Sequence, residues 1–301
     1  MKTDLSHLPD RKRRDLDRVV EILFAEFEDA VGLSTQKWKK QGRILKVILY
    51  GSYARGDWVA DPVGGYFSDY DVLVVVNDER LTDTLDYWAK AGDHLLRDYS
   101  ITKRLSAPAN FIVHSLKDVN DQLARGRPFF VDIVRDGVAL YQLDNHPFDT
   151  PKPLDPVIAR EEAQTHFDQW YASASEFLGL AKFAISQEWN NRAAFNLHQA
   201  AEHFYHTTLL VLTLYSPKSH KLNFLRERAE DVARDLIPVW PRDSKFARRC
   251  FELLQQAYVN ARYSPHYKIT REELDWIVER IELLQAEVKS IADKRLTTDQ
   301  P

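Results

Sequence analysis

Two short polar segments, each beside an apolar run, contain the residue types that bind phosphate and metal. The sequence GSYARGD begins with Gly51 and Ser52, directly after one apolar run. The sequence SDYD holds Asp69 and Asp71 at the start of a second run. Backbone N–H groups and a hydroxyl at a strand end can bind phosphate, and paired carboxylates suit Mg²⁺. Together the two segments predict a site for a metal-bound triphosphate.

The elements around these segments follow an α/β pattern with a small sheet. Helical spacing of apolar residues predicts helices over residues 16–31 and 80–97. Short apolar runs predict strands over residues 44–50, 71–76 and 109–113. Residues two apart in a strand project from the same face, so Asp69 and Asp71 direct both carboxylates to one point. An ordinary polar strand end is the alternative for this pair taken alone.

The succession of GSYARGD and SDYDVLVVV resembles the minimal nucleotidyltransferase domain of the DNA polymerase β-like superfamily, over about residues 40–143. The resemblance implies an α/β (α+β) domain with a small mixed sheet, a two-metal Mg²⁺ site, and ATP or another NTP as substrate. A nucleoside monophosphate would be transferred to a hydroxyl. By resemblance the nucleotide-binding residues are Gly51, Ser52, Arg55 and Ser68, and the catalytic metal ligands are Asp69 and Asp71.

The third carboxylate of that family is missing from the matching strand, which reads ANFIVH. Asn110 or His114 can stand in its place, and Asp132 in PFFVDIV is the nearest acid. Two carboxylates can hold Mg²⁺ although no group then removes the acceptor's proton. A catalytically weak nucleotide sensor is therefore the first alternative function.

Four prolines between residues 145 and 157 separate this region from a helical second half. We expect a nucleotidyltransferase domain over 1–145, a Pro-rich linker over 146–156 and an all-α helical bundle over 157–301. The expected helices of the bundle cover residues 157–187, 190–214, 219–236, 244–262 and 270–293.

The segments HQAAEHFYH and ARYSPHY resemble the HEPN domain (higher eukaryotes and prokaryotes nucleotide-binding), so the whole chain resembles a nucleotidyltransferase fused to HEPN. The resemblance implies a site of Arg262, His266 and Tyr267, in which Tyr267, or less favourably Tyr263, accepts AMP. A structural role for both tyrosines is the alternative. Arg262 and His266 lie one residue closer than in metal-independent HEPN RNases, which ranks a toxin-type RNase below nucleotide binding.

One further group on the helix over 190–214 has the spacing of metal ligands. His198, Glu202 and His206 recur every four residues and share one helix face. A polar face packed against another helix is the commoner arrangement for such residues, and we prefer it here.

Composition limits the class of protein and its partners. A net charge of −4 argues against coating nucleic acid, and a single cysteine, Cys250, excludes an intrachain disulfide and fits a reducing compartment. With a charged N-terminus and no long apolar run, we expect a cytoplasmic protein without a membrane role, and the HEPN resemblance favours a homodimer. The acceptor stays open among a small molecule, a protein tyrosine and an RNA end, and an aminoglycoside-type antibiotic nucleotidyltransferase is a further alternative.

Overall fold

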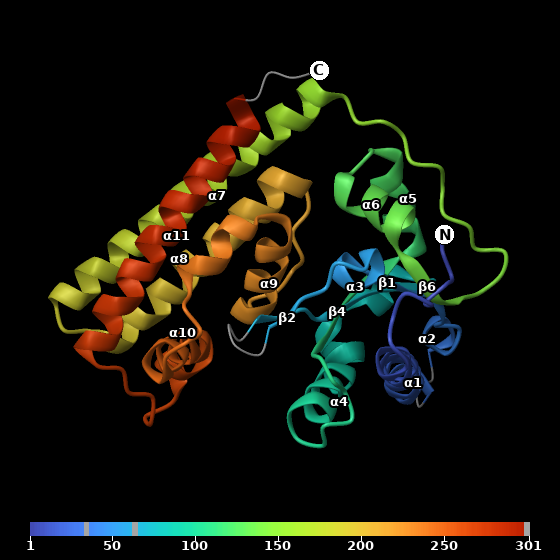
Figure 1. Ribbon diagram of the computed structural model, residues 1–301, viewed down its shortest axis with the longest axis horizontal. Coiled ribbons are helices and arrows are strands. Elements are labelled where there is room, and N and C mark those ends of the chain that lie inside the picture. The colour runs from blue at the N-terminus through green and yellow to red at the C-terminus, as the bar shows by residue number, and fades with distance from the viewer. Residues whose placement is uncertain (33–35, 62–65, 298–301) are drawn as a thin grey trace. The chain divides into compact units, whose positions relative to one another are not determined.

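The computed structural model describes residues 1–32, 36–61 and 66–297. These residues form two compact units, one ending at Leu154 and the other beginning at Asp155 (Figure 1). The limits predicted above for the two domains and the linker stay predictions. No helix that the structure describes is long and apolar enough to cross a bilayer.

A four-stranded mixed sheet forms the centre of the first unit, as predicted. Its strands lie in the order β5-β4-β1-β6, with β4 and β5 parallel and the other neighbours antiparallel. The strands are β1 (Ile44–Tyr50), β4 (Tyr70–Val76), β5 (Ala109–Ser115) and β6 (Val138–Gln142), and the short strands β2 (Ala60–Asp61) and β3 (Tyr66–Phe67) pair separately. Every residue of β1 and β4 is buried, which is why both appear in the sequence as continuous apolar runs.

The predicted helix over 80–97 is wrong in its limits, because the chain forms three successive segments there. The side chain of Asp83 accepts hydrogen bonds from Leu85 N and Asp86 N while its own backbone is extended, so one element ends and another begins at this residue. The helices of the first unit are α1 (Asp10–Gly32), α2 (Lys37–Lys40), α3 (Gly51–Arg55), η1 (Glu79–Thr82), η2 (Thr84–Trp88), α4 (Ala89–Ser100), α5 (Leu116–Ala124) and α6 (Pro128–Asp136).

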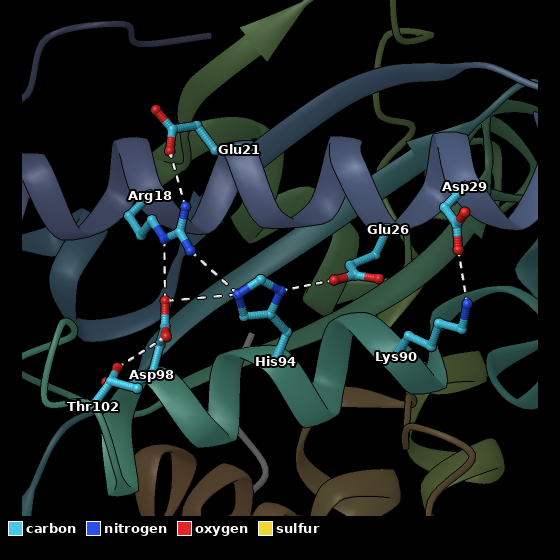
Figure 2. Close-up of polar contacts among 8 residues, drawn as sticks. All are labelled: Arg18, Glu21, Glu26, Asp29, Lys90, His94, Asp98 and Thr102. Carbon is cyan, nitrogen blue, oxygen red and sulfur yellow. Dashed lines mark hydrogen bonds and ion pairs between the residues drawn. The ribbon is translucent and has the colours of Figure 1, made fainter.

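A polar network joins α1 to α4 along the face that these helices share (Figure 2). Arg18 Nε donates to the buried carboxylate of Asp98 at 3.1 Å, and His94 Nδ1 lies 2.7 Å from Glu26 Oε1. Beneath the network, apolar residues of both helices pack against one face of the sheet, including Val72. The network therefore fixes the two helices over the sheet face opposite to the one on which Asp69 and Asp71 lie.

The second unit is a helical bundle, as predicted. Its elements are α7 (Pro156–Ser186), α8 (Asn190–Thr213), α9 (Leu222–Val232), η3 (Arg234–Val239), α10 (Lys245–Tyr263) and α11 (Arg271–Thr297). Helix α8 touches α7, α9, α10 and α11, and Figure 1 shows α7, α8 and α11 as long neighbouring helices. The helix predicted over 219–236 ends instead at Val232, and the chain continues as the 3₁₀ segment η3, which contains Pro238.

Two histidines of helix α8 lie in the interior of this bundle. His198 and His206 are both buried. Burial lowers the pKa of His198 to about 3 and that of His206 to about 4. Both rings are therefore neutral near pH 7, and their burial must oppose protonation in acid.

We expect the second unit to lose stability as the pH falls below the ordinary histidine pKa of 6.5. The unfolded chain then binds a proton on His198 that the folded chain does not bind. The free energy of unfolding therefore falls by about 3 kcal/mol at pH 4 for this one ring. Denaturant unfolding of the full chain between pH 7 and pH 4 measures the effect, and His198→Gln should reduce the pH slope. The matched change at exposed His266 should leave it unchanged, and equal slopes in both variants would contradict the prediction.

Candidate functional site

The site lies where β1 ends beside the first residues of β4 and β5. Tyr50, the last residue of β1, pairs with Asp71 of β4, which also pairs with Asn110 of β5. Paired residues in neighbouring strands project from the same face, and so do residues two apart in one strand. Asp69, Asp71 and Asn110 therefore project together, on the face opposite to that of Val72.

Gly51 is required at the end of β1 for two independent reasons. Its φ is +72°, a left-handed conformation that side chains other than hydrogen disfavour. A Cβ at this position would lie 2.5 Å from Asp71 Oδ2. The backbone turn and the carboxylate of Asp71 thus occupy adjoining space.

Asn110 occupies the place at which the sequence lacked a third carboxylate. Its Nδ2 donates to Asp69 Oδ2 at 2.7 Å, and both aspartates are almost completely buried. His114 lies further along β5, where its Nδ1 is 2.6 Å from Asp118 Oδ2. Of the two residues suggested from the sequence, the structure brings Asn110 to the aspartates and directs His114 elsewhere.

Asp132 belongs to α6 rather than to a strand. Its side chain is half-exposed and pairs with Arg135 at 2.7 Å, one helical turn away. Burial of part of the side chain raises the pKa of Asp132, although the positive charge of Arg135 opposes the shift. This arrangement favours the structural interpretation of Asp132 over the catalytic one.

The remaining residues predicted to bind nucleotide occupy different surroundings. Ser52 is buried in the first turn of α3, next to Gly51. Arg55 ends α3 with an exposed guanidinium 3.3 Å from the carboxylate of Asp57. Ser68 is buried and holds the preceding connection, because its Oγ accepts from Val59 N at 2.9 Å. Ser52 thus lies directly beside the Gly51 turn, whereas Ser68 holds the backbone of the preceding connection.

A buried acid that the sequence analysis missed supports the start of β4. Asp15 of α1 accepts hydrogen bonds from Tyr70 Oη and Ser106 N, both at 2.8 Å. Tyr70 stands between the two aspartates in the chain, so this contact fixes the strand from which they project. The sequence contained one signal for Asp15, because this acid directly precedes Leu16 and lies on the apolar face of the predicted helix.

The electrostatic field of the site is negative. Tyr53 of α3 is buried, and burial raises the pKa of its hydroxyl. The charge of Asp69, followed by those of Asp15 and Asp71, raises it further. Such a field attracts cations and repels anions. A negatively charged triphosphate could therefore bind here only together with metal ions.

The residues present fit one divalent ion better than a complete two-metal site. Asp69 and Asp71 offer buried carboxylate oxygens beside a glycine turn that leaves them room. Across residues 1–32, 36–61 and 66–297, no three His, Cys, Asp or Glu side chains are grouped so that they could hold a metal. Mg²⁺ accepts few protein carboxylates together with water and substrate phosphates, so two aspartates suffice for a metal-bound nucleotide.

The residues predicted for a site in the second unit differ in their exposure. Arg262 and His266 are exposed, and among the described residues no contact joins their side chains. Tyr267 is 7% exposed and donates its hydroxyl to Leu253 O at 2.9 Å, whereas Tyr263 is 73% exposed. Burial also raises the pKa of Tyr267. These positions make Tyr267 less suitable as an acceptor than Tyr263.

The group of His198, Glu202 and His206 does not form a metal site among the described residues. Glu202 Oε2 lies 3.5 Å from His198 Nδ1, and Glu202 Oε1 lies 3.9 Å from His206 Nε2. All three side chains are buried, as expected for a polar helix face packed inside a bundle.

Each of the two units matches a family of known proteins. The family described as "Polymerase beta, Nucleotidyltransferase" matches residues 35–124, and the family described as "HEPN domain" matches residues 167–291. A protein of Methanocaldococcus jannaschii named "Putative protein adenylyltransferase" is 32% identical over 105 residues. The matched segment covers 35% of this chain and 86% of that protein.

We predict that Gly51→Ala destabilises the first unit and weakens binding of a metal-bound nucleotide. The new Cβ meets Asp71 Oδ2 and requires a strained φ, which together cost about 1–3 kcal/mol. Denaturant unfolding and calorimetric titration with an ATP analogue and Mg²⁺ measure the two effects. Gly92→Ala is the control, because no atom lies within 4 Å of its added Cβ, and equal effects of both changes would contradict the role of Gly51.

Proposed function

Because the chain belongs to the polymerase β-type nucleotidyltransferase family and carries a HEPN domain after that domain, we propose that it transfers a nucleoside monophosphate, AMP from ATP, to an acceptor group. The observation that carries this proposal is the pair of buried carboxylates, Asp69 and Asp71, against the Gly51 turn. A hydroxyl of a small molecule, a protein or an RNA end is the acceptor predicted from the sequence. A homodimer also remains part of the proposal.

Each residue of the site has a role that follows from its position. Asp69 and Asp71 would hold Mg²⁺, which neutralises triphosphate charge and stabilises the leaving pyrophosphate. Gly51 allows the backbone to approach the phosphates, and Ser52 offers a hydroxyl and a backbone N–H beside it. Arg55 adds positive charge at the other end of the same short helix. These groups orient the α-phosphorus for in-line attack.

A catalytically weak nucleotide sensor is the second candidate, and Asn110 favours it. An amide that donates to Asp69 cannot take a proton from an acceptor hydroxyl, so the site holds nucleotide without supplying a base. The two candidates share the binding step. They differ in whether bound ATP is converted into an AMP adduct and pyrophosphate.

We expect Asp71→Asn to weaken Mg²⁺-dependent nucleotide binding and to abolish transfer. The substitution keeps the shape of the side chain but removes the charge that holds the cation, so affinity for an ATP analogue with Mg²⁺ should fall at least about tenfold. Calorimetric titration and release of pyrophosphate from ATP provide the measurements. Asp29→Asn, which alters an exposed ion pair with Lys90, is the matched control. Retained Mg²⁺-dependent binding in the Asp71 variant would contradict the proposed function.

We expect the substitution Asn110→Asp to let the site bind a second metal ion. The new carboxylate replaces a donated hydrogen bond with a third anionic ligand, so we expect an additional Mn²⁺ per chain and transfer faster by about tenfold or more. Electron paramagnetic resonance of free Mn²⁺ gives the stoichiometry separately from activity. Asn110→Ala removes the hydrogen bond without adding a ligand and should not gain an ion. An unchanged stoichiometry in the aspartate variant would show that Asn110 does not limit metal binding.

A further inference from the structure

Four exposed cations of the first unit lie where the start of α1 meets the connection between α4 and β5. They form no ion pair with any residue of the described ranges 1–32, 36–61 and 66–297, and they are Arg11, Arg14, Lys103 and Arg104. The whole chain carries a net charge of −4, so an overall basic composition does not explain four unpaired cations in one place. We call these four residues the basic patch.

Hydrogen bonds to two buried acids hold the connection against α1. Asp15 of α1 accepts from Ser106 N at 2.8 Å. Asp98 of α4 accepts from Arg18 Nε of α1 at 3.1 Å and from Thr102 Oγ1 at 3.0 Å, and Figure 2 shows these three side chains together. The two cations of the connection follow Thr102 and precede Ser106 in the chain. They are therefore fixed beside the first turns of α1.

The arginines of α1 are on the side of the helix that faces this connection. Successive residues of an α-helix are rotated by about 100°, so positions 11, 14 and 18 fall within about 60° of one another. Arg18 contacts Asp98 of α4, which places this side of α1 toward α4 and the connection that follows it. Arg11 and Arg14 thus lie on the same side as the two cations of the connection.

The backbone at Lys103 has an uncommon conformation. Its φ is +55°, in the left-handed region that glycine adopts readily and that other residues seldom adopt. The next residues are held by hydrogen bonds, including one from Leu105 N to Asp98 O at 3.1 Å. A lysine in place of the glycine that this backbone favours indicates that a positive charge is needed at this position.

The basic patch lies at the end of the sheet at which β4 and β5 begin. Asp15, which holds the connection, also accepts from Tyr70 Oη at 2.8 Å, and Tyr70 N donates to Pro108 O at 2.8 Å. Tyr70 stands between Asp69 and Asp71 in the chain. The contacts that hold the patch therefore also hold the start of the strand from which these two aspartates project.

The side chains of this surface match the chemistry of a single polynucleotide strand. Three of the four cations are arginines, whose guanidinium groups donate paired hydrogen bonds to phosphate oxygens. Lys103 Nζ lies 5.5 Å from the ring centroid of the half-buried Tyr99, and the nearby side chain of Ile101 is 74% exposed. Cations beside aromatic and apolar side chains offer contacts to bases as well as to phosphates, whereas an acidic protein surface would use the cations alone.

We propose that the basic patch binds the phosphate backbone of a single-stranded polynucleotide. The inference goes beyond the proposed function, because the strand is held by charge and its binding needs neither Mg²⁺ nor ATP. It also bears on the acceptor. Of the acceptors predicted from the sequence, an RNA end is the one whose chain this surface of the first unit would bind.

Fluorescence anisotropy of a labelled single strand of about 12 nucleotides, titrated with the full chain without Mg²⁺ or ATP, tests the proposal. The strand is used as RNA and as DNA of the same sequence; binding of either supports the proposal, and the tighter one identifies the source. Arg14→Gln together with Arg104→Gln should weaken binding about tenfold or more at low salt. The slope of log affinity against log salt should become shallower by about 1.4, because each lost phosphate contact contributes about 0.7.

Lys37→Gln together with Lys40→Gln is the matched control. These exposed lysines of α2 follow the other end of α1, about 30 Å along the helix, and removing them changes the net charge by the same amount. We expect the control to retain both the affinity and the salt slope. All four positions are exposed, so denaturant unfolding should be unchanged in both variants.

Three results would overturn the assignment of the basic patch. One is that neither strand binds the wild-type chain. Another is an equal loss of affinity in both double variants, since binding would then follow net charge and not this surface. The third is displacement of the strand by polyglutamate at the same concentration of charge, which would show that an acidic protein surface fits equally well. None of these results affects the proposed function, which Mg²⁺-dependent binding of an ATP analogue tests separately.

Discussion

Burying two carboxylates side by side is the constraint on which the first unit depends. Asp69 and Asp71 are 4% and 1% exposed, and such charges are costly to bury unless a donor or a cation compensates them. The sheet brings them together because β4 is central, with β1 ending beside it and β5 beginning beside it. Gly51 leaves them space and Asn110 donates to one of them. The same geometry is unfavourable without a compensating positive charge, which is why the proposed function places a metal ion here.

The second unit contains a buried carboxylate too, but compensates it differently. Glu202 is paired with the imidazole of His220, while burial holds His198 and His206 neutral. A neutral interior around one carboxylate strengthens its interaction with its single hydrogen-bonded partner. The buried carboxylate of Glu202 is therefore compensated by a residue at the surface, because the His220 side chain is 60% exposed.

Local patterns in the sequence predicted the elements that carry the site, and they missed contacts between distant segments. The strands β1 and β4 could be predicted because burial on both faces requires continuous apolar runs. Asn110 could be named because the family resemblance places a third carboxylate on the matching strand. The pairing of Glu202 with His220 could not, since it depends on how the chain returns after α8. The break at Asp83 was missed because apolar spacing continues through it, although the side chain caps two backbone N–H groups.

Asn110 links the chemistry of the nucleotide site to the kind of acceptor it can serve. An amide in place of a carboxylate makes the site less negative by one unit and removes a proton acceptor. The amide also donates the hydrogen bond that orders Asp69, which an ionised carboxylate could not do. Under the proposed function such a site can hold a metal-bound triphosphate, but the proton of a hydroxyl acceptor must be removed by another group.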